Sequence, residues 1–145
     1  MLSRVADNLY WMSRYVERAE GVTRLVEVNR DTDLESYANG TKRDYWQSAL
    51  SAMCAVEDFA KDELDDHELF ILFSKDWSSS VSTCINMARE NARMVRDQLS
   101  EEIWVELNNL YLYLNSPTLP EKFSNDPQSF FRRTIRFSLV FQGLS

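Results

Sequence analysis

Apolar residues recur every three to four positions along most of the chain, which is the pattern of helices that bury one face. The first such stretch runs from Ser3 to about Val28. Its apolar face consists of residues at helical spacing: Val5, Leu9, Met12, Val16, Ala19, Thr23 and Val26. The segment from Asn29 to Gly40 is rich in Asp, Asn and Ser, and we expect the helix to end there in a loop.

The same spacing predicts five more helices in the rest of the chain. They cover residues 41–59, 69–73, 81–99, 100–114 and a last stretch from 127 onward. Residues 62–67 form a polar break, and residues 117–125 are the clearest loop. No stretch shows the period-two alternation of a strand. We predict an all-α fold, an antiparallel helical bundle of about five to six helices in a single domain, residues 1–145.

Capping residues mark several of these boundaries. Thr41, with an acid three residues later, is typical of an N-cap, and Ser78–Ser80 precedes the helix that follows the polar break. Ser100 and the two acids after it indicate a restart or a bend, because negative charge suits a helix N-terminus. Asp126-Pro127 has the sequence of a cap followed by a first helical turn.

Composition narrows the class of protein. Three Gly and three Pro in 145 residues are few turn formers, which favours long helices over a turn-rich β fold. The net charge of −7 disfavours nucleic-acid binding, because that binding needs a basic surface. No apolar run approaches the roughly 18–20 residues that span a bilayer, and no signal-peptide core is present at the N-terminus. We expect a cytoplasmic protein that binds neither nucleic acid nor membrane, with Cys54 and Cys84 buried as reduced thiols.

A charged string lies opposite the apolar face of the first helix. Arg14, Glu17 and Arg18 project there, together with Tyr10 and Gly21. A glycine in the middle of a helix costs about 1 kcal/mol relative to alanine, which a closely approaching neighbour would explain. We therefore expect another helix to cover this face and the charges to form a buried or half-buried ion network. A ligand or partner site and a plain solvated surface are the alternatives.

A second charged string lies in the middle of the chain. Arg89, Arg93 and Arg96 recur at i, i+4 and i+7, with Glu90 and Asp97 on the adjacent strip. We interpret the string as a salt-bridge ladder in which Arg93 pairs with both acids. The alternative is an anion clamp, because guanidinium groups suit carboxylate and phosphate. If the two strings face each other across a helix pair, they form one network.

The sequence gives little indication of metal binding or catalysis. His67 follows Glu63 by four residues, a spacing that permits a metal pair, but one His without a second His or Cys is a poor ligand set. We expect no metal and no cofactor. No Ser/His/Asp or Cys/His arrangement and no Gly-rich phosphate loop is present, so the residues name no reaction. The 18 aromatic residues exceed what a core of this size covers, which indicates a partner surface. The candidates for that surface are Trp11, Trp77, Tyr111 and Tyr113.

Two blocks of sequence carry a resemblance to a known family. The opening, Met1 to Glu20, and the block from Cys84 to Trp104 are similar to the bacterial alpha-E family, a predicted all-helical family named for its Glu-Arg dipeptide. The blocks occur in the family's order, and the resemblance covers the whole chain. Glu17-Arg18 is the position that matches the name-giving motif.

The resemblance implies a role more than a reaction. Members are encoded beside, or fused to, ATP-grasp and transglutaminase-like proteins, which implies an accessory role in making or modifying peptide-like amide bonds. We expect a helical binding or scaffold module with an ATP-grasp-type amide ligase or a transglutaminase-like protein as partner. The competing hypothesis is an enzyme or ligand sensor whose Arg/Glu cleft takes a carboxylate or phosphate. Members are generally longer, so we expect an N-terminal half or short member that forms a homo-oligomer to cover its apolar surface.

Overall fold

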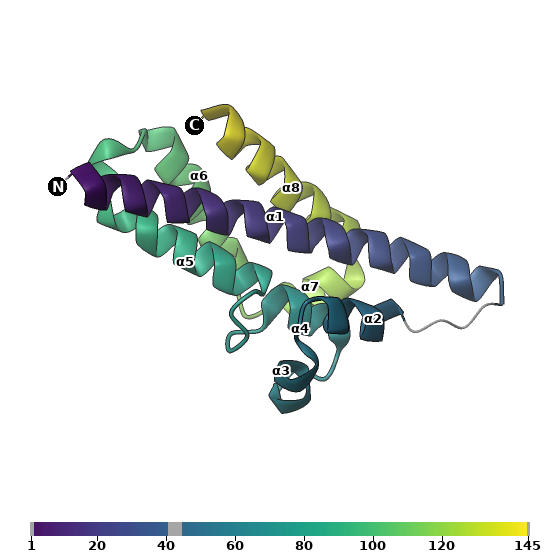
Figure 1. Ribbon diagram of the computed structural model, residues 1–145. Coiled ribbons are helices and arrows are strands. Elements are labelled where there is room, and N and C mark those ends of the chain that lie inside the picture. Colours follow the sequence, from purple (N-terminus) through teal and green to yellow (C-terminus); the bar gives the residue numbers. More distant parts are fainter. Residues whose placement is uncertain (1, 41–44, 145) are drawn as a thin grey trace.

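The computed structural model describes residues 2–40 and 45–144, and Figure 1 shows that helices make up most of this part. The predicted cap at Thr41 lies outside the described residues. Eight α-helices and one 3-10 turn occur in the described part, and no strand is present there. They are α1 (Leu2–Ala38), α2 (Tyr45–Ala52), α3 (Val56–Lys61), α4 (His67–Phe73), α5 (Val81–Met94), η1 (Arg96–Gln98), α6 (Glu101–Leu114), α7 (Leu119–Asn125) and α8 (Pro127–Leu144). The all-α prediction is confirmed, whereas the predicted number of five to six helices is wrong.

The two additional helices lie in a segment predicted to be one helix and in a segment predicted to be a loop. The helix expected over residues 41–59 is split into α2 and α3 by a turn at Cys54, which adopts a φ of 55°. Cys54 is exposed on this turn, so its predicted burial is wrong. The segment predicted to be a loop over residues 117–125 contains α7. Pro120 lies in its first turn, where the missing N–H is tolerated, and burial of Leu119 and Phe123 stabilises the helix.

α1 is longer than predicted, with 37 residues. The polar residues after Val28 do not end it, because Thr32 Oγ1 donates to the Val28 carbonyl (2.8 Å) and Arg30 binds Glu68 of α4. The helix ends at Ala38, shortly before Gly40, which has a φ of 73° that favours glycine. Neither α1 nor another helix in the described part combines the length and the apolar character needed to cross a membrane.

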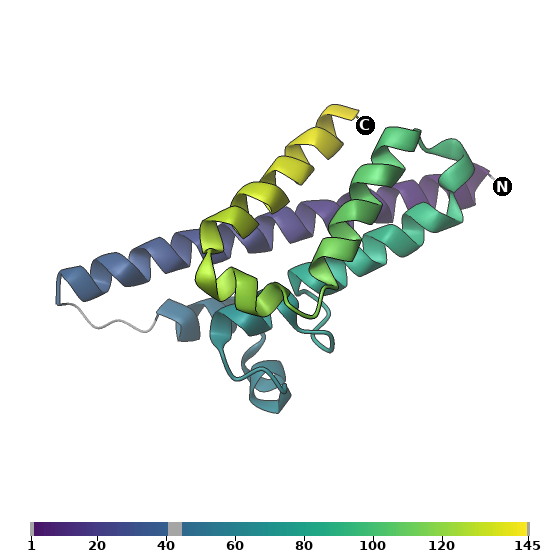
Figure 2. The same ribbon diagram turned by 180° about the vertical axis from the view of Figure 1, so that it is seen from behind.

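The four long helices, α1, α5, α6 and α8, form an antiparallel bundle. α5 and α8 run beside α1 in the opposite direction, and α6 lies next to both of them on the side that Figure 2 shows. The short helix α4 packs on α1 and α5, and α7 packs on α8. The bundle interior is therefore closed by helices from the middle and the end of the chain.

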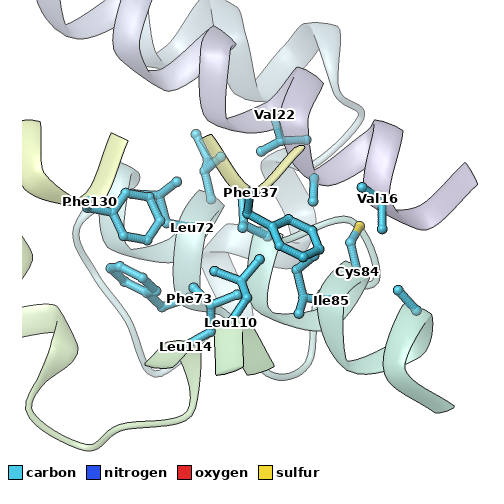
Figure 3. Close-up of a cluster of buried hydrophobic side chains, with 14 of the residues drawn as sticks. Val16, Val22, Leu72, Phe73, Cys84, Ile85, Leu110, Leu114, Phe130 and Phe137 are labelled. Carbon is cyan, nitrogen blue, oxygen red and sulfur yellow. The ribbon is translucent and has the colours of Figure 1, made fainter. Parts of the chain in front are cut away.

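The core fills the space between these helices (Figure 3). The predicted apolar faces of α5, α6 and α8 are confirmed, because their central residues are buried. These include Cys84, Ile85, Ala88, Leu107, Leu110, Phe130, Phe137 and Phe141. On α1, burial is complete from Met12 to Val26 along the predicted face, while Val5 and Leu9 are half-buried. Helical periodicity therefore identified the buried side of each long helix correctly.

Three predicted caps are also present. Ser80 Oγ accepts a hydrogen bond from Thr83 N (3.1 Å), and Ser100 Oγ accepts one from Ile103 N (3.2 Å). Asp126 Oδ1 accepts one from Ser129 N (3.3 Å) at the start of α8. Each satisfies a backbone donor that the helix itself leaves free, so local sequence set these three starts.

Candidate functional site

Five exposed side chains on the solvent side of α1 form what we call the outer face of α1. They are Tyr10, Trp11, Arg14, Glu17 and Arg18. Arg14 Nη1 lies 3.3 Å from Glu17 Oε2, and both side chains are more than half exposed. Tyr10 and Trp11 are 56% and 47% exposed, and their rings meet edge to face with centres 5.3 Å apart. The outer face of α1 therefore presents two aromatic rings and three charges to solvent.

The predicted burial of this charged string is wrong. A Cβ added at Gly21 would meet no atom within 4 Å, so the close neighbour inferred from that glycine is missing among the described residues. α5 and α8 pack against other sides of α1. The Arg14–Glu17 pair is a solvent-screened pair within one helix, and such pairs contribute little to stability.

A carboxylate at the edge of this face, that of Glu20, joins α1 to α8. Its Oε2 accepts hydrogen bonds from Ser138 Oγ (2.9 Å) and Gln142 Nε2 (3.3 Å) of α8, and its Oε1 lies 3.2 Å from Arg24 Nη2. Sequence reasoning missed this role because the partners on α8 are more than 100 residues away. The signal that points to Glu20 is its position at the edge of the apolar face of α1.

In the second charged string, Arg89 is held against α6. Its Nε donates to Asn108 Oδ1 at 2.9 Å, and its guanidinium lies 4.4 Å from the ring centre of Tyr111 and 5.5 Å from that of Trp104. Arg96 lies 4.7 Å from the ring centre of Trp104. Because aromatic faces attract cations, two of the three arginines of this string join α5 and η1 to α6.

The remaining charges of the second string pair only in part as predicted. Arg93 Nη2 lies 3.0 Å from Glu90 Oε2, which confirms one pair of the ladder, and Glu90 Oε1 lies 3.7 Å from Arg89. The pair between Arg93 and Asp97 does not form in the structure, because α5 ends at Met94 and the turn η1 breaks the helical spacing. Within residues 2–40 and 45–144, no ion pair joins the two strings, so they do not form one network.

The surroundings of Cys84 and His67 indicate structural roles for both side chains. Burial raises the pKa of the Cys84 thiol to about 11, and the positive charge of Arg18 opposes part of this rise. The thiol therefore stays protonated, and unreactive, at neutral pH. His67 stacks on the ring of Phe59 with centres 4.7 Å apart. In the described part of the chain, three or more His, Cys, Asp or Glu side chains never gather as a metal site requires.

One ion pair connects two helices that are distant in sequence. Arg30 Nη1 on α1 lies 2.9 Å from both carboxylate oxygens of Glu68 on α4. Burial raises the pKa of Glu68, and Arg30 opposes the rise. Neither residue was singled out in the sequence, because no local spacing relates them.

A groove of about 580 Å³ lies between α6 and α8, and we call it the α6–α8 groove. It is lined by Glu106, Asn109, Leu110, Ser129, Arg132, Arg133, Arg136, Phe137 and Val140. Its volume is within the range of small-molecule sites. Sequence analysis did not single out these arginines, although α8 has three arginines and no acid, a signal that was available.

Further grooves lie on the surface of the described part. The larger, of about 470 Å³, lies beside the loops around α4 and the end of α6, and its lining includes Asp62, Glu63 and Asp76 with Lys75. The smaller lies at the start of α6 and adjoins the α6–α8 groove, with which it shares Glu106 and Val140. The eight charged residues singled out from the sequence, from Arg14 to Asp97, line none of the three grooves described here. The charges predicted to form a site are therefore exposed or lie between helices, and the grooves are lined by other residues.

Comparison with known proteins gives a family match. No curated protein and no solved structure matches the chain. Residues 1–145 match the family Alpha-E, described as a predicted alpha-helical domain with a conserved ER motif. Glu17-Arg18, on the outer face of α1, is the one Glu-Arg dipeptide in the sequence. The chain therefore belongs to the Alpha-E family.

Proposed function

We propose that this chain is a helical binding or scaffold module whose protein partner docks on the outer face of α1. The observation that carries this proposal is the exposure of Glu17 and Arg18 beside two exposed aromatic rings, Tyr10 and Trp11. Trp, Tyr and Arg are the residue types most enriched at energetically important positions of protein interfaces. Side chains that fold stability does not require are available for recognition.

The partner we propose is an ATP-grasp-type amide ligase that acts on peptide-like substrates, with a transglutaminase-like protein as a second candidate. The support for these partners is the family resemblance of the two sequence blocks. The proposed place of action is the cytoplasm, and the support for it is that both cysteines are free thiols. In this role the module positions or regulates the ligase and performs no chemistry itself.

The competing proposal, an enzyme or ligand sensor built on the Arg/Glu strings, has less support. Its cleft requires the eight charged residues to converge, and they are divided between the outer face of α1 and the junction of α5 with α6. Arg89 and Arg96 already contact aromatic rings, which leaves them less free to clamp an anion.

We also propose that copies of the chain associate. Large apolar side chains at least 40% exposed occur on several of the described helices, including Val28, Leu34, Met94, Leu112 and Leu139. Exposed apolar surface of this kind favours association. Size-exclusion chromatography with light scattering is expected to give a dimer or larger assembly, and a stable monomer at micromolar concentration overturns this proposal.

Docking on the outer face of α1 is tested with the purified ATP-grasp protein encoded nearest to this chain's gene. Isothermal titration with the full chain is expected to give a saturable complex, weakened at least tenfold by Trp11→Ala or Arg18→Ala, as for interface anchors. The controls are Gln98→Ala and Lys122→Ala, which remove an exposed polar group and an exposed cation outside the outer face of α1. A complex that all four variants form equally well places the interface elsewhere, and no complex with the ligase removes the proposed partner.

A further inference from the structure

The α6–α8 groove has a local charge opposite to that of the whole chain. Its lining contains three arginines and one acid, Glu106, whereas the chain carries a net charge of −7. The groove of about 470 Å³ beside α4 has the opposite charge, because three carboxylates and one lysine are among its lining residues. A concave surface of one sign focuses the field and attracts ligands of the opposite sign.

The three arginines project from one face of α8. Arg132, Arg133 and Arg136 are spaced i, i+1 and i+4, and Ser129 and Val140 continue the same face. None of the three guanidiniums has a carboxylate within ion-pair distance among the described residues, in contrast to Arg14, Arg24, Arg30 and Arg93. The α8 sequence contains no acid that could neutralise them. Their charge is therefore left for an anion from outside the chain.

One of these arginines is already positioned. The guanidinium of Arg133 lies 4.0 Å from the ring centre of Tyr113, a half-buried residue of α6 that itself packs on Phe130. A guanidinium stacked on an aromatic ring keeps its N–H groups free at the edge, where they bind oxygen atoms. Holding Arg133 in this way lowers the entropy lost when an anion binds.

The floor of the groove is apolar. Leu110, Phe137 and Val140 form it, and Asn109 and Ser129 add neutral hydrogen-bonding groups beside the arginines. An apolar floor with a few polar groups is typical of sites for small organic molecules, and a volume of about 580 Å³ suits one. An inorganic ion alone would leave the floor unused.

From these observations we propose that the α6–α8 groove binds a small organic ligand that carries an oxyanion, a carboxylate or a phosphate, on an apolar body. The oxyanion lies among Arg132, Arg133 and Arg136, and the apolar body lies on Leu110, Phe137 and Val140. Glu106 disfavours a second negative charge at its end of the groove. This site is separate from the outer face of α1 and does not depend on the proposed docking there.

The test uses the full chain and three probes, phenyl phosphate, hydrocinnamate and inorganic phosphate, titrated by two-dimensional amide NMR. We expect saturable shifts at Asn109 and Ser129 with phenyl phosphate or hydrocinnamate, and weaker binding of inorganic phosphate, which has no apolar body. The stronger of the two organic probes identifies the oxyanion. Shifts spread over the whole surface without saturation, or saturable binding at other residues only, overturn the proposal.

Three variants decide whether the groove is the site. Arg132→Gln with Arg136→Gln is expected to weaken the stronger probe at least tenfold, while Glu106→Gln is expected to tighten it roughly threefold, because it removes a repulsive charge. The control, Arg4→Gln with Lys122→Gln, removes two exposed cations outside the groove and is expected to change affinity less than twofold. Circular dichroism melts establish that each variant is folded. Equal weakening by the control pair means a general charge effect and overturns the site.

Discussion

The arginines of α5 and those of α8 have similar spacing and different surroundings. Arg89 donates to Asn108 and contacts the rings of Tyr111 and Trp104, so it joins two helices. Arg132 and Arg136 line an open groove and have no ion-pair partner among the described residues. The difference lies in the facing helix. α6 presents two aromatic rings and the Asn108 amide to Arg89, whereas toward α8 its Tyr113 ring contacts Arg133 and leaves Arg132 and Arg136 without a ring partner among the described residues. The contrast shows that the groups on the neighbouring helix decide whether an arginine joins two helices or remains free to bind a ligand.

The largest effect in this comparison is expected from Trp104, which holds two arginines and is 9% exposed. Trp104→Ala removes a nearly buried ring and is expected to lower the free energy of unfolding by about 3 kcal/mol. Urea denaturation followed by circular dichroism measures it. Trp11→Ala, at a site 47% exposed, is the control and is expected to cost less than about 1 kcal/mol. Equal effects of the two substitutions would contradict a structural role for the α5–α6 contacts.

The next effect concerns an arginine whose partner is a half-buried acid. Arg30→Ala leaves Glu68 unpaired and is expected to lower the free energy of unfolding by about 2 kcal/mol at pH 7. Burial already raises the pKa of Glu68 above its usual 4.5, and loss of Arg30 raises it further. The folded state then binds a proton more tightly than the unfolded state, so stability falls as pH rises from about 4.5 through the folded pKa.

The pH dependence provides the check on Arg30→Ala. At pH 4 Glu68 is largely protonated in both states, so the cost of the substitution is expected to be smaller there than at pH 7. Urea denaturation of both proteins at the two pH values measures the difference. A cost that is the same at both values would mean that the ion pair is not its source.

A direct comparison of the two arginine clusters is expected to give a smaller difference. Arg89→Ala leaves Asn108 Oδ1 without its donor and removes two aromatic contacts, so we expect a loss of about 1 kcal/mol in the free energy of unfolding. Arg132→Ala removes an exposed side chain that has no hydrogen-bond, ion-pair or ring partner among the described residues, and we expect a loss of less than about 0.5 kcal/mol. Both are measured by urea denaturation, and a larger loss for Arg132→Ala would reverse the comparison.

The smallest effect is a change in the titration of one phenol. Burial raises the pKa of Tyr113, and the positive charge of Arg133 opposes the rise. Arg133→Ala is therefore expected to raise the pKa of Tyr113 further, measured by NMR with ring-labelled tyrosine. Arg132→Ala serves as the control and is expected to leave it nearly unchanged. A lower pKa in Arg133→Ala would mean that the guanidinium does not lie on the ring.

The burial of the charged strings could not be predicted from the sequence. The pattern correctly placed Arg14, Glu17 and Arg18 opposite the apolar face of α1, yet it gave no information on whether a helix covers them. The inference from Gly21 was wrong because a glycine is also tolerated on an open surface. Glu20, one turn from Glu17 and at the edge of the buried face, is an acid of this segment that contacts another helix, α8.

The sequence by itself determined the all-α class, the buried face of each long helix and the starts capped by Ser80, Ser100 and Asp126. These features depend on contacts three or four residues apart, so they can be read from a single segment. Tertiary structure decided that α1 continues to Ala38, that α7 forms, and which arginines are held and which line a groove. Those outcomes depend on burial and partners from distant segments, such as Glu68 for Arg30 and Tyr113 for Arg133, and no local spacing encodes them.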